Sequence, residues 1–136
     1  MRLNLENDYG FRIIYAFCTE DEGVIMTSAQ LSQNLLIPER FTYRILRKLI
    51  QAGLIDSIRG PKGGYVLAKK PSQITLYDVY KAISGDLVIN ACVVDGVCEA
   101  GCRFGNCAVH NSLYNIQGVI EKEFKNVIFS DLIEKQ

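Results

Sequence analysis

The 136-residue sequence contains little that points to a membrane or to secretion. It has no apolar run near the ~20 residues that a membrane-spanning helix requires. The opening residues, Met-Arg-Leu-Asn-Leu-Glu-Asn, lack the apolar segment of a signal peptide. No internal repeat or low-complexity tract is present. We therefore expect a cytoplasmic protein with one compact domain, alone or with a dimerisation element.

The sequence also lacks the patterns of an enzyme. We find no paired nucleophile and base, and the glycines between Gly60 and Gly64 follow no nucleotide-binding pattern. Hydrophobic residues make up 49% and charged residues 22%, which is enough apolar surface for an ordinary core. The expectation is a folded protein that is not an enzyme.

Net charge is absent as well, since the formal charge at pH 7 is zero. Taken alone, this value argues against a nucleic-acid partner. The average hides an uneven distribution, because residues 37–70 carry eight basic and two acidic residues, a net charge of +6, and the rest of the chain carries −6. A local basic patch of this kind is typical of a protein that binds phosphates.

Apolar spacing predicts two helices in the first part of the chain. The first runs from about Asn7 to Cys18. Thr27 can cap a short second helix that continues to about Leu35. Its residues predicted to face the core are Ala29, Leu31 and Leu35.

A third helix and a hairpin follow. Pro38 suits the first turn of a helix that extends to about Ala52, and Gly53 is placed to end it. Two short strands, residues 54–58 and 65–68, are joined by a glycine-rich basic turn. Two helices followed by such a hairpin predict a winged helix-turn-helix, in which the third helix enters the major groove of DNA.

Further helices complete a mainly α fold with one small β-hairpin. Thr75 can cap a fourth helix, and a long helix is expected from about Cys107 to Val127, with a short one after it. The long helix has a heptad-like apolar seam formed by Val109, Leu113, Ile116, Ile120 and Val127. We expect this seam to pair with a second copy. The predicted division is residues 1–84 for DNA binding, 85–106 for a cysteine-rich loop and 107–136 for dimerisation and the C-terminal segment.

The residues predicted to contact DNA lie on the second helix, the third helix and the hairpin. Arginine can bond guanine through two hydrogen bonds, and basic or polar side chains can hold phosphates. Arg59 at the hairpin tip is suited to the minor groove or to a phosphate. The predicted set is Ser28, Gln30, Arg40, Tyr43, Arg44, Arg47, Lys48 and Arg59.

Four cysteines and the one histidine are grouped between the fourth and the long helix. They are Cys92, Cys98, Cys102, Cys107 and His110, with the spacing C-x5-C-x3-C-x4-C-x2-H. Thiolates hold zinc or iron–sulfur clusters, and the wide gaps favour a cluster over the close pairs of structural zinc sites. Inert cysteines are the simpler alternative. We interpret Cys18, on the apolar face of the first helix, as a core residue.

Two runs of sequence resemble the wing and fourth helix of the IscR/NsrR family of bacterial winged-helix regulators. They are Ser57-Ile-Arg-Gly-Pro-Lys-Gly-Gly-Tyr-Val-Leu67 and Ile74-Thr-Leu-Tyr-Asp-Val-Tyr-Lys-Ala-Ile83. The opening Met-Arg-Leu and the run Cys107-Ala-Val-His110 also fit. The resemblance implies a homodimeric transcription regulator, expected to be a repressor with a palindromic operator, that carries a [2Fe–2S] or [4Fe–4S] cluster. It would sense iron–sulfur status, redox state or nitric oxide.

The resemblance also implies which residues hold the cluster. Cys92 and Cys107 match the first and last of the three cysteines of the family, and either Cys98 or Cys102 matches the middle one. For the fourth ligand, His110 matches the histidine of the iron–sulfur biogenesis regulators. Asp8 matches the aspartate that reaches the cluster from the partner subunit in nitric-oxide sensors. All four cysteines binding together is a further option.

Two other regulators remain open at this point. One is a metal-free regulator of cysteine metabolism that answers to a partner enzyme, although relatives of that kind lack the loop cysteines. The other is a switch based on zinc or on a disulfide.

Overall fold

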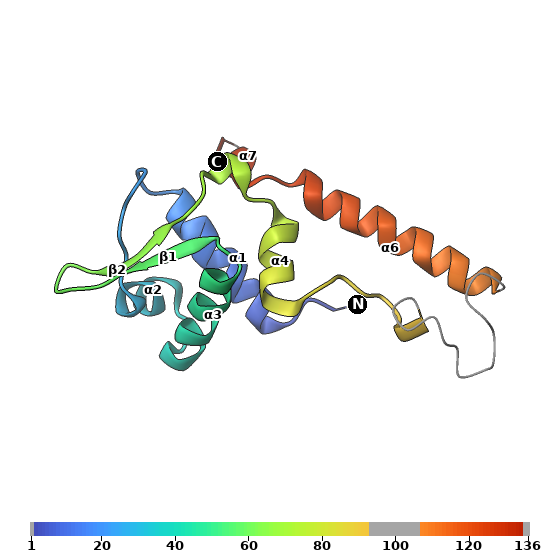
Figure 1. Cartoon of the computed structure of the whole chain (residues 1–136), viewed down its shortest axis with the longest axis horizontal. Helices are drawn as coiled ribbons and strands as arrows, with labels where there is room; N and C mark the ends of the chain where they lie inside the picture. Colours follow the sequence, from blue (N-terminus) through green and yellow to red (C-terminus); the bar gives the residue numbers. More distant parts are fainter. Residues whose placement is uncertain (1, 93–106, 135–136) are drawn as a thin grey trace.

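The computed structural model describes residues 2–92 and 107–134. Over these residues the chain is mainly helical with one antiparallel hairpin, which confirms the predicted fold class. Figure 1 shows α1 to α4 and the hairpin grouped together, with α6 extending away from them. The elements are α1 Leu5–Cys18, α2 Ser28–Leu35, α3 Glu39–Gln51, β1 Ile55–Ile58, β2 Gly64–Leu67, the 3-10 helix η1 Pro71–Gln73, α4 Leu76–Ser84, α6 Ala108–Asn126 and α7 Phe129–Glu134.

Helix α1 begins two residues earlier than predicted because a polar pair caps it. The Asn7 backbone N–H donates to the Asn4 side chain at 2.8 Å, and the Asn4 N–H donates back to Asn7 at 3.2 Å. This reciprocal arrangement satisfies two backbone donors that a helix start leaves without partners. Asn7 is therefore buried as part of the cap, whereas the sequence pattern counted only apolar residues.

The helix-turn-helix has the predicted boundaries. Thr27 caps α2, and a left-handed residue, Leu36 at φ 55°, ends it. Pro38 precedes α3, and Gly53 at φ 74° follows it. The prediction that Ala29 faces the core is wrong, since it is exposed while Leu31 is buried. With only eight residues, α2 turns one narrow side inward.

The hairpin of β1 and β2 is the predicted wing. Its register pairs Ile55 with Leu67 and Ile58 with Gly64. The turn between the strands depends on Gly63, where an added Cβ would lie 2.1 Å from the carbonyl oxygen of Ile58. The tip can therefore close only with glycine at that position.

One main core holds the first four helices and the hairpin together. Ile13, Ile14, Ile45, Leu49 and Ile55 are all at 0% exposure. The first two come from α1, the next two from α3, and Ile55 begins the wing. The wing is thus anchored at its base to the same core that holds α3.

The chain returns to this core after α6. Phe129, at the start of α7, is 1% exposed and belongs to the main core. Its N–H donates to the carbonyl oxygen of Ile74 at 3.0 Å, and Leu76 N–H donates to Val127 at 2.9 Å. The segment after α6 therefore packs against the residues that begin α4. Across the described residues, no helix combines the length and apolar character needed to cross a bilayer.

Replacing Phe129 tests this anchoring. We expect Phe129→Ala to lower the free energy of unfolding by about 3–5 kcal/mol, because truncating a buried aromatic removes apolar burial and leaves a cavity. Tyr43→Ala is the control, since Tyr43 is 51% exposed. Urea unfolding followed by circular dichroism measures both. Equal effects of the two substitutions would contradict the placement of Phe129.

Candidate nucleic-acid interface and cysteine segment

Helix α3 presents a basic face to solvent. Arg40, Tyr43, Arg44 and Arg47 are exposed, and their spacing of three and four residues places them on adjoining turns. The opposite face is apolar and fills the core through Ile45, Leu46 and Leu49. Burial of one side of α3 therefore fixes which side its cations occupy.

An aromatic ring orients two of these arginines. The guanidinium carbons of Arg40 and Arg44 lie 4.9 and 5.4 Å from the centre of the half-buried Phe41 ring. Phe41 in turn contacts Tyr9 of α1, with ring centres 6.1 Å apart. A cation near an aromatic face is attracted to it, so both arginines are held near one rigid support.

A single carboxylate on α1 engages two cations of α3. Glu6 accepts hydrogen bonds from Arg44 at 2.7 Å and from Lys48 at 2.9 Å, and Lys48 Nζ also donates to the Ile83 carbonyl at 3.1 Å. Lys48 is therefore only partly accessible, with 33% of its side chain exposed, unlike the other predicted DNA contacts of α3, which are exposed. The hydrogen bonds from Lys48 and then Arg44 lower the pKa of Glu6. No sequence pattern had singled out Glu6.

The other predicted DNA contacts lie on the wing and α2. Arg59 is exposed at the tip of the hairpin. Gln30 is exposed, and its side-chain oxygen accepts the Thr27 N–H at 2.8 Å as part of the α2 cap. Ser28 is only 9% exposed. The predicted set is therefore presented unequally, with the arginines of α3 and the wing most accessible.

The cysteine segment is described only at its two ends, because Cys98 and Cys102 lie outside the described residues. Cys92 is half-buried, and Cys107 caps α6 with its sulfur accepting the His110 N–H at 3.5 Å. Within the described ranges, no three or more His, Cys, Asp or Glu side chains come together to hold a metal ion. Among the predicted ligands that the structure describes, Cys107 and His110 lie together at the start of α6.

The two candidates for a fourth ligand have different surroundings. His110 is 6% exposed, and its ring stacks on Tyr114 with centres 6.5 Å apart. Asp8 lies on the first turn of α1 with its side chain half-exposed, and it pairs with Arg12 at 2.5 Å. Binding a metal through Asp8 therefore requires this ion pair to rearrange.

Cys18 differs from the grouped cysteines. It is 5% exposed in the main core, and burial raises the pKa of its thiol to about 11. A thiol that stays protonated at neutral pH is a poor metal ligand. The structure agrees with the interpretation of Cys18 as a core residue.

Helix α6 combines a packed side with an exposed apolar side. Ile120 and Phe124 pack against a small cluster formed by Tyr77, Tyr80 and Leu87, with Phe124 edge-on to Tyr80 at 5.7 Å. By contrast, three apolar residues on this helix are largely exposed: Val109 at 67%, Ile116 at 50% and Val119 at 61%. The predicted seam is thus divided, because Ile120 packs against residues of the same chain whereas Val109 and Ile116 are exposed to solvent.

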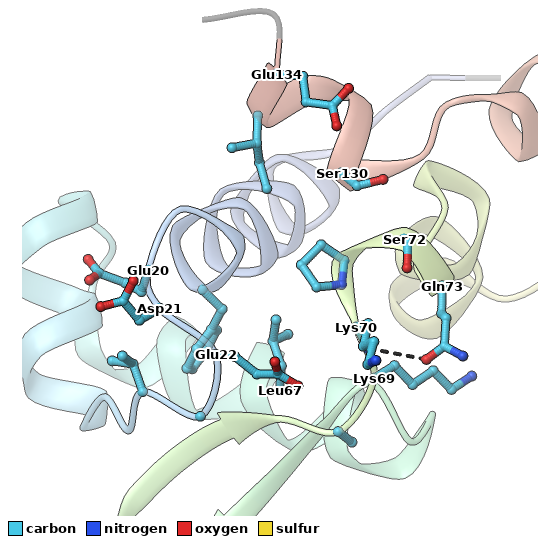
Figure 2. Close-up of a pocket in the computed structure, with 16 residues that line it drawn as sticks. Glu20, Asp21, Glu22, Leu67, Lys69, Lys70, Ser72, Gln73, Ser130 and Glu134 are labelled. Atoms are coloured by element: carbon cyan, nitrogen blue, oxygen red, sulfur yellow. Dashed lines mark hydrogen bonds between the residues drawn. The ribbon is translucent and has the colours of Figure 1, made fainter.

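A cavity of about 660 Å³ lies elsewhere on the domain (Figure 2). The connection between α1 and α2, the end of β2, η1 and α7 line it. Lys70 and Gln73 on its wall are joined by a hydrogen bond of 3.3 Å between the Lys70 N–H and the Gln73 side chain. Among the described residues, none of those predicted to bind DNA or metal lines this cavity.

The Glu6 ion pairs give a pH-dependent prediction. A carboxyl whose pKa is lowered by folding contributes stability above its ordinary value of 4.5, and this contribution is lost as the pH falls through the lower, folded pKa. We expect Glu6→Gln to cost up to about 1 kcal/mol at pH 7, as for partly exposed ion pairs. The gap to the unchanged chain should close on acidification below 4.5. Thermal unfolding across pH measures it, and a gap that is constant with pH would contradict the pairing.

Sequence comparisons relate the chain to known regulators. A family model described as Rrf2, iron-dependent transcriptional regulator, matches residues 3–135. The HTH-type transcriptional regulator IscR of Escherichia coli O1:K1 is 24% identical over 136 residues, which cover 100% of this chain and 82% of that protein. The YwgB protein of Bacillus subtilis is 45% identical over 60 residues, but this match spans 44% of this chain and 38% of that protein.

A solved structure shares the fold. The structure of CymR, the global cysteine regulator of B. subtilis, has a TM-score of 0.81 and 21% identity, and the match covers 100% of this chain and 98% of that one. At this identity the likeness establishes the winged-helix fold alone. The family model, by contrast, spans almost the whole chain and agrees with the predicted resemblance. The protein belongs to the Rrf2 family of transcriptional regulators, and it is not an enzyme.

Proposed function

We propose that the chain binds double-stranded DNA through α3 and the wing and regulates transcription from there. The exposed basic face of α3 carries the proposal, because Arg40, Arg44 and Arg47 are presented together while the opposite face is fixed in the core. Arg59 extends the positive surface to the wing tip. In helix-turn-helix proteins the recognition helix, here α3, lies in the major groove, and the helix before it, here α2, crosses the DNA backbone. Ser28, Gln30, Tyr43 and Lys48 complete the proposed contact set.

We infer that the working form is a cytoplasmic homodimer joined through α6. Val109, Ile116 and Val119 leave an apolar strip exposed, and pairing two copies of the strip would bury it. A two-fold dimer presents two α3 helices to two half-sites, so we propose a palindromic operator. In this division, residues 1–84 bind DNA, 85–106 hold a cofactor and 107–136 include the dimer helix.

We further propose an iron–sulfur cluster held by Cys92 and Cys107 together with Cys98 or Cys102. The geometry at Cys107 fits, because the sulfur is placed at the positive end of the α6 dipole and already accepts an N–H. His110 and Asp8 are the proposed alternatives for a fourth ligand. A bound cluster supplies a group that changes with oxidation, nitric oxide or iron supply. The chain would then act as a repressor whose affinity for DNA depends on that group.

A metal-free regulator is the second candidate. The shared fold with CymR, named as a cysteine regulator, favours it. Four grouped cysteines favour the cluster instead. Zinc or a disulfide is the remaining way in which these thiols can act as a switch.

Arginine substitutions test the DNA-binding face. We expect Arg40→Ala and Arg59→Ala each to weaken binding to a duplex selected from a random pool by the unchanged chain, by about 1–3 kcal/mol where a base contact is lost. Lys122→Ala, on the exposed face of α6, is the control. Fluorescence anisotropy at fixed salt measures the dissociation constants. If the Lys122 variant loses as much affinity as the other two, α3 and the wing are not the DNA-binding face.

Anaerobic purification tests the cofactor. We expect visible absorption with matching iron and sulfide content, and its loss in Cys92→Ala and Cys107→Ala because each removes a thiolate ligand. Cys98→Ala, Cys102→Ala, Asp8→Ala and His110→Ala assign the remaining ligands. Cys18→Ala removes a buried thiol and should keep the cluster, which makes it the matched control. A colourless protein that contains zinc would contradict the proposed iron–sulfur cluster. A protein that contains no metal would favour the metal-free regulator.

A further inference from the structure

Glu6 joins the start of α1 to the basic face of α3. Its two oxygens lie 2.7 Å from Arg44 Nη1 and 2.9 Å from Lys48 Nζ, so each oxygen is taken by a different cation. The Glu6 side chain is 21% exposed, whereas that of Arg44 is 56% exposed. The carboxylate is therefore held against α3, at the edge of the face that we assign to DNA.

The arrangement resembles the way in which a DNA phosphate would be bound. A phosphate offers negatively charged oxygens to arginine and lysine donors, and so does the Glu6 carboxylate. By contrast, Arg40 and Arg47 form no ion pair with any described residue. The cations of α3 thus fall into two classes, two that are available at once and two that are already engaged.

We propose that Glu6 is a specificity-determining residue that limits binding to arbitrary DNA, by occupying Arg44 and Lys48 until a phosphate displaces it. This inference rests on the proposed DNA-binding function of α3. Binding to arbitrary sequence comes almost entirely from phosphate neutralisation, and each neutralised phosphate steepens the dependence on salt. Withholding two cations lowers that binding, whereas contacts from the unengaged arginines are unaffected.

The ion pairs have the character that such a role requires. Arg44 is mostly exposed and Lys48 is one-third exposed, so solvent screens both pairs and a well-placed phosphate can compete for them. A deeply buried pair would withhold its cations permanently. Lys48 also donates to the Ile83 carbonyl at 3.1 Å, so it stays near α4 when Glu6 releases it. Arg44 is the cation that is free to move outward.

Salt-dependent binding of Glu6→Gln to a random-sequence duplex tests the inference. Glutamine keeps the size of the side chain and removes its charge. If Arg44 and Lys48 both reach phosphates, the loss of affinity between 50 and 200 mM salt should grow by about tenfold relative to the unchanged chain. Binding at 50 mM salt should also tighten. Full-length chains prepared identically are compared by anisotropy, with folding checked by circular dichroism.

Three companion variants decide what the result means. Glu20→Gln removes the same charge just beyond the other end of α1 and should leave the salt slope unchanged. Adding Arg44→Ala and Lys48→Ala to Glu6→Gln should abolish the gain. The double variant Arg40→Ala/Arg47→Ala should weaken binding whatever the role of Glu6.

Each outcome has one meaning. The inference is overturned if folded Glu6→Gln has the same salt dependence of affinity as the unchanged chain, or if Glu20→Gln changes that dependence as much as Glu6→Gln does. In either case, weaker binding by Arg40→Ala/Arg47→Ala would still support the proposed DNA-binding face. A gain that survives loss of Arg44 and Lys48 also overturns it. If the Arg40/Arg47 variant binds normally, the proposed function fails, and this inference fails with it.

Discussion

The close packing of α1 against α4 is the constraint on which the other contacts depend. At Gly10 of α1, an added Cβ would lie 3.0 Å from the Ile83 side chain and 3.3 Å from that of Val79, so a larger residue would force these side chains to shift by a few tenths of an ångström. Asn7 strengthens the contact by donating to the Ser84 hydroxyl at 2.8 Å. This fixes the first turn of α1, from which Glu6 reaches α3.

Helix α4 then connects the proposed DNA-binding face to the rest of the chain. Its Tyr77 and Tyr80 pack against α6, and it leads directly toward the segment that begins at Cys92. A continuous series of contacts therefore runs from α6 through α4 and α1 to the cations of α3. Packed contacts of this kind can transmit a change at the cysteine segment only if they have more than one stable arrangement. The proposed cofactor would have to favour one of them.

Much of this fold could be predicted because local signals agree with the tertiary structure. Thr27, Pro38 and Gly53 set the helix boundaries near the positions that capping and turn chemistry predict. The apolar face of α3 is buried through Ile45, Leu46 and Leu49, and the glycine-rich run forms the wing, as predicted. The prediction that Ala29 faces the core is wrong because apolar spacing over only eight residues is weak evidence for which side of a helix is buried.

The contacts that the sequence could not show are long-range. Glu6 pairs with Arg44, which lies 38 positions further along the chain. Phe129 lies in the main core with residues of α1 and α3, although it follows α6 in the sequence. An exposed-looking glutamate and a C-terminal phenylalanine carry no local sign of such partners. For the same reason, the apolar spacing of α6 could not divide its seam between Ile120, which packs within the chain, and Ile116, which is exposed.

We propose that the DNA affinity of this regulator depends on a group held by its cysteine segment. The direct measurement compares the affinity of iron–sulfur-loaded and cluster-free homodimer for one selected duplex, anaerobically and at matched salt. The two affinities should differ by about fivefold or more, the usual lower range of coupling between two sites. Equal affinities in the two forms would contradict it.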